Sequence, residues 1–169
     1  VPALRRLAQR YAVVGVVTQP DRPAGRGRNL TPPPVKILAQ ELCLPLIQPV
    51  KLRQTEALEQ LIRWAPDLIV VAAFGQILRP QVLDLPLQGC LNVHASLLPR
   101  WRGAAPITAA ILHGDDKTGV TIMRMDPGVD TGPMLSQRAE PVHQDDTTTS
   151  LSLRLSELGA DLLLETLPG

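Results

Sequence analysis

Residues 91–103, LNVHASLLPRWRG, hold the densest group of side chains able to do chemistry. Asn92 and His94 are two residues apart, so on a strand both side chains point to the same face. An amide that donates a hydrogen bond and an imidazole that moves a proton could together polarise a carbonyl group. An asparagine bonded to loop backbone and a histidine packed in the core would account for the same two residues. The segment alone leaves both interpretations open.

A second candidate is the turn at residues 126–132, DPGVDTG. Its two glycines, Gly128 and Gly132, would let the backbone approach a ligand closely. Asp130 lies between them and could orient a histidine and stabilise its charged form. Turns rich in Asp and Gly are usually only structural, so the motif is weak by itself. Asp126 is assigned a structural role.

A third candidate is the basic segment at residues 18–36, TQPDRPAGRGRNLTPPPVK, for which no helix or strand is predicted before Pro33. Loops of this length are often functional or mobile. Four cations against one aspartate give the segment a local excess of positive charge, which could steer an anionic partner. Arg26 and Arg28 stand beside glycines and suit contacts to phosphate, although a solvated loop remains the alternative. The G-x-x-x-x-G-K-[ST] order of a P-loop is absent.

Short apolar runs alternating with amphipathic segments must position these side chains. The apolar runs predict strands at residues 13–18, 45–48, 68–73, 90–94, 121–125 and 134–138. The amphipathic segments predict helices at residues 1–10, 33–42, 54–65, 105–112 and 147–167. This alternation predicts an α/β fold, Rossmann-like, with a mainly parallel twisted sheet flanked by helices. Asn92 and His94 then lie at the carboxyl end of a strand, where such sheets bind ligands.

The bulk composition narrows the class of protein. With 169 residues, 44% of them hydrophobic and 20% charged, the chain suits one globular domain. Its apolar runs are too short to cross a bilayer, and its three histidines lack metal-ligand spacing, so neither a membrane span nor a metal site is predicted. Cys43 and Cys90 are predicted to be two buried free thiols rather than a disulfide.

The motif Asn92-x-His94-x-Ser96-Leu97-Leu98-Pro99, with Gly103 four residues on, resembles the signature of the folate-dependent formyltransferases. Asp130 falls at the spacing from His94 that the catalytic aspartate of that family occupies. The basic segment, PRWRGAAPI and TGVTIMRMDPGVDTG resemble the branch of the family that acts on methionyl-tRNA. The similarity covers nearly the whole chain and implies the formyltransferase fold.

The resemblance implies a reaction and a role for each site. The formyl group of 10-formyltetrahydrofolate, a co-substrate, would pass to the α-amine of initiator methionyl-tRNA without a metal. Asn92 would donate to the formyl oxygen, His94 would stabilise the oxyanion and exchange a proton, and Asp130 would hold His94. The implied folate-binding residues are Ser96, Leu97, Leu98, Pro99, Gln76, Ile77 and Leu78, and the implied tRNA-binding residues are Arg26 and Arg28. The protein would be a cytoplasmic monomer, bacterial or organellar, that does not bind membranes.

Residues 1–169 are expected to form one catalytic domain. The opening helix has no strand before it, although a crossover needs one, so we expect a strand to be missing there. The family that the chain resembles normally ends in a tRNA-binding β-barrel, and we expect that domain to be absent here after Gly169. Two other interpretations stay open: a formyltransferase that acts on a sugar-nucleotide amine, and a non-catalytic RNA-binding Rossmann module.

Overall fold

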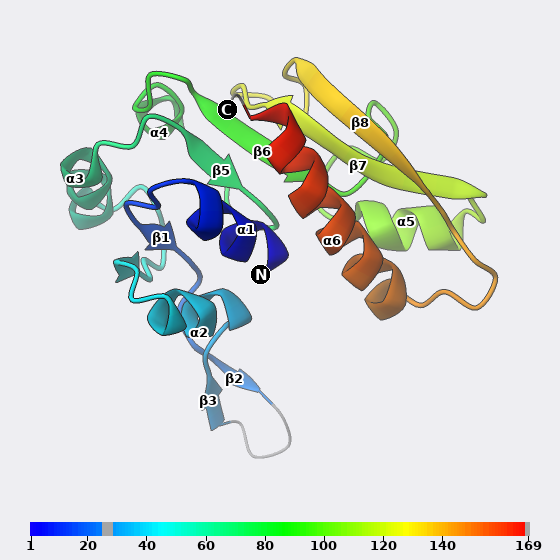
Figure 1. The fold of residues 1–169 in the computed structure, drawn as a ribbon, viewed down its shortest axis with the longest axis horizontal. Coiled ribbons are helices and arrows are strands. Elements are labelled where there is room, and N and C mark those ends of the chain that lie inside the picture. Colours follow the sequence, from blue (N-terminus) through cyan, green and yellow to red (C-terminus); the bar gives the residue numbers. More distant parts are fainter. Residues whose placement is uncertain (25–28, 168–169) are drawn as a thin grey trace.

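The computed structural model describes residues 1–24 and 29–167. Its helices are α1 (Pro2–Arg10), α2 (Pro34–Glu41), α3 (Thr55–Trp64), α4 (Pro80–Leu83), α5 (Pro106–Leu112) and α6 (Thr148–Thr166). Its strands are β1 (Val16–Val17), β2 (Arg22–Ala24), β3 (Asn29–Thr31), β4 (Leu46–Ile47), β5 (Ile69–Val71), β6 (Cys90–His94), β7 (Lys117–Arg124) and β8 (Met134–Pro141). Strands and helices alternate, which confirms the predicted α/β class (Figure 1).

The strands of the main fold pair in parallel up to β6 and antiparallel beyond it, and β2 and β3 form a separate antiparallel pair. β1 pairs with β4, and β5 pairs with β6, in parallel. β6, β7 and β8 then follow one another as antiparallel neighbours in a sheet of order β5-β6-β7-β8. β7 and β8 pair antiparallel because the short turn at residues 126–132 joins them, and such a connection cannot make a parallel pair.

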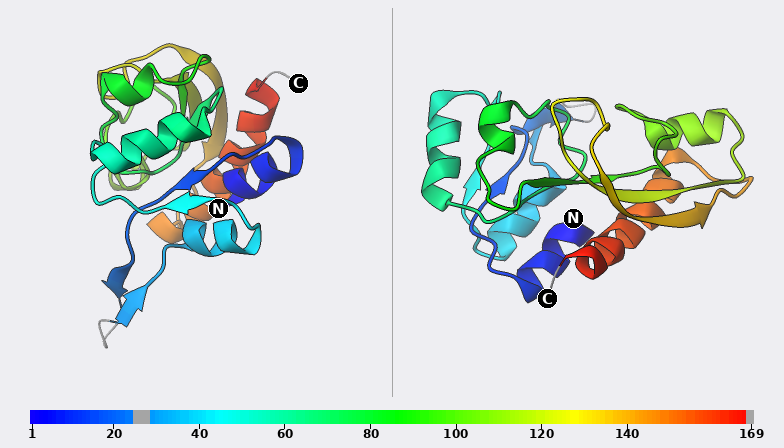
Figure 2. Two further views of the ribbon diagram at one scale, coloured as in Figure 1. Left: turned by 90° about the vertical axis from the view of Figure 1, so that its left-hand side faces the viewer. Right: turned by 90° about the horizontal axis from the view of Figure 1, so that it is seen from above.

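Two apolar cores lie on opposite faces of this sheet. Leu91 of β6 and Ile122 of β7 pack against α6, and α1 lies beside α6 on that face (Figures 1 and 2). Cys90 of β6 points to the other face and packs with residues of α3 and α4. Because side chains alternate along a strand, Asn92 and His94 share the face of Cys90.

Local signals explain where the helices begin. Pro34, Pro80 and Pro106 each open a helix, at the position where a missing N–H costs nothing. Thr147 caps α6 through a reciprocal pair of hydrogen bonds with Ser150. The short helix α4 was not predicted, although Pro80 is a starting signal, because four residues are too few to show a helical period.

The basic segment contains a small hairpin, contrary to the expectation of a loop without secondary structure. β2 and β3 pair antiparallel and project away from the rest of the molecule (Figures 1 and 2). At its base Lys36 donates to both carboxylate oxygens of Asp21, at 2.9 and 2.7 Å, and Gln48 donates to the same carboxylate at 2.8 Å. The hydrogen bond from Lys36 lowers the pKa of Asp21. The hairpin is therefore anchored where it leaves the fold.

Both cysteines are free, as predicted, but only Cys90 is buried, so the expected burial of Cys43 is wrong. Cys43 follows α2 with a φ of +53° and is exposed. Cys90 is 1% exposed, and its thiol lies 3.7 Å from the carbonyl oxygen of Val82 and 3.9 Å from that of Leu83. Burial raises the pKa of the Cys90 thiol to about 11. The thiol thus ties β6 to α4.

Candidate active site

Asn92 and His94 lie near the carboxyl end of β6, at the edge of the sheet where β5 also ends. The parallel register pairs Val71, the last residue of β5, with Asn92. The loop that follows β5 therefore starts beside the loop that follows His94. His94 is only 6% exposed, whereas Asn92 is half-buried. The carboxyl ends of two parallel strands meet there, which is where ligands bind in open α/β sheets.

Asp130 joins the two predicted partners across a long sequence separation. Its Oδ1 accepts a hydrogen bond from Nδ2 of Asn92 at 3.1 Å, and its Oδ2 accepts one from the N–H of Gly103 at 2.8 Å. The same Oδ2 lies 3.5 Å from Nδ1 of His94. Asp130 has a φ of +50°, in the left-handed region that Asp tolerates better than most residues. The turn thus aims the carboxylate at β6.

The contact made by Nε2, the other ring nitrogen of His94, indicates which nitrogen carries the proton. Nε2 lies 3.0 Å from the carbonyl oxygen of Trp101. A carbonyl oxygen can only accept, so Nε2 carries a proton and Nδ1 faces the carboxylate of Asp130. A second proton on Nδ1 would lie between the ring and Asp130. The pair can therefore take up and release a proton on that edge, while the opposite edge stays fixed.

The side-chain amide of Asn92 can donate one further hydrogen bond. Its amide nitrogen has two N–H groups, and Asp130 takes one of them. The second N–H is available to a bound carbonyl oxygen. A preorganised amide donor of this kind stabilises an oxyanion.

The neighbouring Asp126 shapes the turn, as expected. Its Oδ1 accepts from the N–H of Gly128 at 3.0 Å and from the hydroxyl of Thr131 at 2.8 Å. Gly132 lies so close to Arg124 that an added Cβ would be 2.0 Å from the Arg124 carbonyl oxygen. Asp126 and Gly132 hold the turn that presents Asp130.

Side chains of β7 and β8 hold the loop at residues 96–99 in place. Ser96 is fully buried and donates to the carbonyl oxygen of Arg100 at 2.6 Å. Thr121 accepts from the N–H of Leu98 at 3.1 Å and donates to the carbonyl oxygen of Ser96 at 2.7 Å. Gln137 donates to the carbonyl oxygen of Leu98 at 2.8 Å. The side chain of Ser96 is thus engaged in holding the loop.

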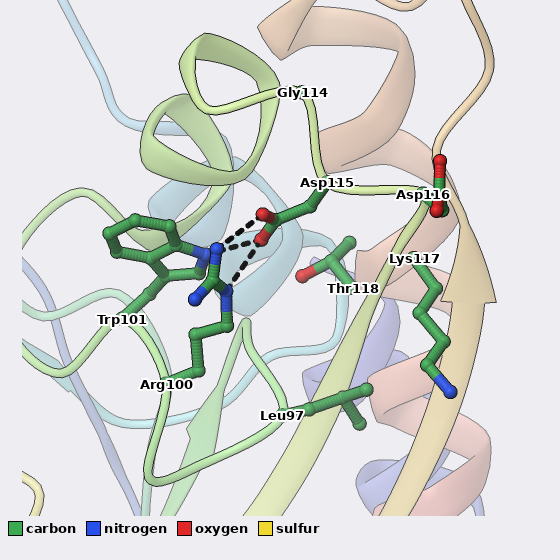
Figure 3. A pocket seen from close by; sticks show the side chains of 8 residues that line it. All are labelled: Leu97, Arg100, Trp101, Gly114, Asp115, Asp116, Lys117 and Thr118. Atoms are coloured by element: carbon green, nitrogen blue, oxygen red, sulfur yellow. Dashed lines mark hydrogen bonds and ion pairs between the residues drawn. The ribbon is translucent and has the colours of Figure 1, made fainter.

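The remaining predicted folate residues fall into different environments. Leu98 is 5% exposed and belongs to the packed interior, Leu97 is half-buried, and Pro99 is exposed. Leu97 lines a cavity of about 590 Å³ together with Arg100, Trp101 and residues 114–118 (Figure 3). Their contacts with folate stay predictions.

A second cavity, of about 540 Å³, follows β5 and includes Gln76 and Ile77 of the predicted folate set. Gln76 accepts from the N–H of Leu52 at 2.9 Å, which fixes the loop against the segment before α3. Ile77 is 79% exposed, whereas Leu78 is 4% exposed and packs in the core. Three cations and no carboxylate line this cavity: Lys51, Arg53 and Arg79. We refer to it as the cationic cleft.

The sequence reasoning missed several residues of the site. Trp101, Thr121 and Gln137 hold His94 and the loop at 96–99, and the cations of the cationic cleft were not singled out. The cluster of cations in KLRQ could have drawn attention to the cleft. The contacts of Trp101 and Gln137 had no sequence signal.

The predicted tRNA-binding residues Arg26 and Arg28 lie outside the described residues. In residues 1–24 and 29–167, no three His, Cys, Asp or Glu side chains gather as a metal site would require. No helix in the same part of the chain is long and apolar enough to cross a membrane.

The chain is similar to known proteins along nearly its whole length. The family model described as Formyl transferase matches residues 1–167. The methionyl-tRNA formyltransferase of Halorhodospira halophila is 59% identical over 169 residues, covering 99% of this chain and 54% of that protein. Its counterpart in Geobacter sulfurreducens is 56% identical over 167 residues, covering 98% and 53%. The chain thus spans about half the length of these curated relatives.

Solved structures agree on the fold. Phosphoribosylglycinamide formyltransferase from Bacillus halodurans matches with a TM-score of 0.79 at 23% identity, covering 97% of this chain and 87% of that one. A sugar N-formyltransferase from a Shewanella species matches with a TM-score of 0.63 at 25% identity, covering 79% and 50%. The first likeness establishes the α/β fold that the sequence predicted.

Proposed function

Since this chain belongs to the formyl transferase family, we propose that it moves the formyl group of 10-formyltetrahydrofolate to the α-amine of methionyl-tRNA. The observation that carries the proposal is the single carboxylate, Asp130, bonded to Asn92 and Gly103 and facing His94 at the end of β6. The choice of methionyl-tRNA as acceptor rests on the 56–59% identity to enzymes that bear that name.

The proposed chemistry begins with attack of the amine nitrogen on the formyl carbon, which forms a tetrahedral intermediate with a negatively charged oxygen. The free N–H of Asn92 donates to that oxygen. The attacking nitrogen becomes positively charged and gives up a proton to the edge shared by Asp130 and Nδ1 of His94. The same edge returns the proton to N10 of the folate as the bond from N10 to the formyl carbon breaks. Charge and atoms then balance, and no metal takes part.

The cationic cleft accounts for the donor's other end. Folate ends in a glutamate, whose carboxylates are ionised at neutral pH. We assign the glutamate end to Lys51, Arg53 and Arg79, with the loop at 76–78 and the loop at 96–99 on either side of the pterin. Arg53 and Arg79 are exposed, and exposed ion pairs contribute about 0.2–1 kcal/mol, so Arg53→Ala or Arg79→Ala should raise the KM for the folate by up to about fivefold. Arg63→Ala on α3 is the matched control, since Arg63 is exposed and bonds Gln60.

The decisive experiment compares acceptor amines. The purified protein is incubated with 10-formyltetrahydrofolate and with methionyl-tRNA, an amino-sugar nucleotide or phosphoribosylglycinamide, and formylated product is measured. Transfer to methionyl-tRNA far above the other two is the expected result. Preference for the sugar amine would establish the rival formyltransferase. Folate binding and transfer both absent, with RNA bound, would establish the non-catalytic module.

A cytoplasmic or organellar location, where translation begins, follows from this proposal, and so does initiator methionyl-tRNA as partner. Arg26 and Arg28 of the basic segment are the proposed contacts to tRNA phosphates. We propose that the protein works as a monomer.

A further inference from the structure

Trp101 makes an unusual connection to the active site through its backbone. Its carbonyl oxygen lies 3.0 Å from Nε2 of His94, which makes it the partner of that ring nitrogen. Trp101 has a φ of +58°, in the left-handed region that bulky residues rarely adopt. That conformation is unfavourable for a residue with a bulky side chain, so surrounding contacts must hold it. Released, this peptide would rotate toward an extended conformation and carry its carbonyl oxygen away from His94.

The contacts that hold Trp101 come from the far side of the loop. Its indole N–H donates to Oδ2 of Asp115 at 2.6 Å. Arg100 places its guanidinium 4.3 Å from the centre of the Trp101 ring, and the His113 ring centre is 4.4 Å away. Figure 3 shows the carboxylate of Asp115 facing both Arg100 and Trp101, with dashed lines to each. The indole is therefore both bonded and covered.

Asp115 holds both Arg100 and Trp101 in place. It stands between the end of α5 and the start of β7, and its N–H donates to the carbonyl oxygen of Ala110 at 3.0 Å. Its side chain is 10% exposed and accepts two hydrogen bonds from Arg100, at 2.9 and 2.5 Å. These bonds keep the carboxylate ionised and aimed at the indole. Asp115, Trp101 and His94 thus form one chain of contacts from the end of α5 to the catalytic ring.

We propose that Asp115 and Trp101 are positioning residues that fix the proton of His94 on Nε2 and turn Nδ1 toward Asp130. The inference rests on the proposed function, because it supposes that His94 exchanges a proton during transfer. Each ring nitrogen of His94 faces an acceptor, and the shorter contact, 3.0 Å from Nε2 to the Trp101 carbonyl oxygen against 3.5 Å from Nδ1 to Asp130, favours the proton on Nε2 in the neutral ring. Loss of the Trp101 acceptor would let the proton move to Nδ1, and the ring could then no longer accept a proton on the edge that faces Asp130.

The test uses two variants and one matched control. Trp101→Phe keeps an aromatic ring beside Arg100 and His113, loses the indole N–H and makes the ring system smaller. Asp115→Asn removes the charge that orders Arg100 and the indole. Asp116→Asn is the control, since it removes one negative charge from the adjacent, exposed residue. For each protein the imidazole signals of His94 are followed by 15N NMR against pH. The chain has only three histidines, which simplifies assignment.

In the wild type and in Asp116→Asn, the proton of neutral His94 should reside on Nε2. Both positioning variants should show a mixture of the two tautomers. Their kcat for formyl transfer should fall about tenfold or more, as small displacements of catalytic groups typically cause, while the KM for folate stays within about twofold. If Asp115→Asn fails to fold, Trp101→Phe decides the question.

Unchanged His94 signals in the folded variants would overturn the inference, whatever happens to the rate. A changed tautomer with full kcat would overturn it too. Failure of the proposed function looks different: the wild type would not formylate methionyl-tRNA, yet the tautomer comparison would still show whether Asp115 and Trp101 set the His94 ring.

Discussion

Asp130→Asn separates charge from shape at the candidate active site. Asp130 has a φ of +50°, and Asn is among the few residues that adopt this region readily, so the turn should keep its backbone. Asn also has nearly the same volume as Asp. The substitution replaces one carboxylate oxygen by an NH₂ group and removes the negative charge.

The expected magnitude follows from the partners of the carboxylate. Oδ1 accepts from Asn92, and Oδ2 accepts from Gly103 and faces His94. Whichever way the new amide is turned, its NH₂ group meets a donor, and one half-buried donor loses its acceptor, which costs at most about 1–3 kcal/mol. An NH₂ group beside Nδ1 would also donate to the neutral ring of His94 and oppose its second proton. Loss of acid–base function typically lowers a rate on the order of 10²–10⁴-fold.

The assay is single-turnover formylation, measured beside folate binding and thermal unfolding. Asp130→Asn should lose rate on the order of 10²–10⁴-fold, with folate affinity within about twofold of wild type. The double variant His94→Ala/Asp130→Asn should be little slower than the slower single, because both residues act on one proton. Near-normal transfer by Asp130→Asn would refute the reasoning. A purely structural role predicts that melting temperature and folate affinity fall together.

Three further predictions concern other parts of the chain. In Gly119→Ala the new Cβ would lie 2.1 Å from the Arg138 carbonyl oxygen, so urea unfolding should show a loss of about 1–3 kcal/mol, and an unchanged midpoint would contradict this. Hydrogen bonding from Arg100 lowers the pKa of Asp115 from 3.8 to about 2. The difference in free energy of unfolding between wild type and Asp115→Asn should therefore be full above pH 4 and vanish as the pH falls through 2. A difference that does not change with pH would count against this prediction. Arg26→Ala with Arg28→Ala should lower the salt slope of tRNA binding by about one unit per lost phosphate contact, leaving folate binding unchanged; an unaltered slope would mean that the basic segment does not contact tRNA.

The sequence predicted those features that depend on local periodicity. The apolar run at 90–94 is a strand, and the spacing of Asn92 and His94 places both on one face. The runs at 13–18 and 68–73 contain strands of only two and three residues, since strand length depends on where the partner strands end. The antiparallel pairing of β7 and β8 follows from their short connection, which the sequence also displayed.

The parts that could not be predicted depend on contacts between distant residues. Trp101 reaches His94 because its backbone adopts a left-handed conformation, which nothing in the residue type Trp suggests. Gln137 supports the loop at 96–99 from a strand 39 residues away. The contact between Asp130 and β6 was expected from the family spacing alone, because no local pattern relates a turn to a strand that precedes it.

The rate at which the Cys90 thiol is alkylated can report local opening of the fold. Only the thiolate is alkylated, and with a pKa of about 11 roughly one thiol in 10⁴ is ionised at pH 7. The group is also 1% exposed, so a reagent meets it only when β6 and α4 separate. Cys43, exposed after α2, reacts first and can be capped beforehand. The rate of the slow alkylation of Cys90 then measures how often the face of the sheet below Asn92 and His94 opens. If added folate lowers this rate, the decrease measures how strongly the bound donor keeps that face closed.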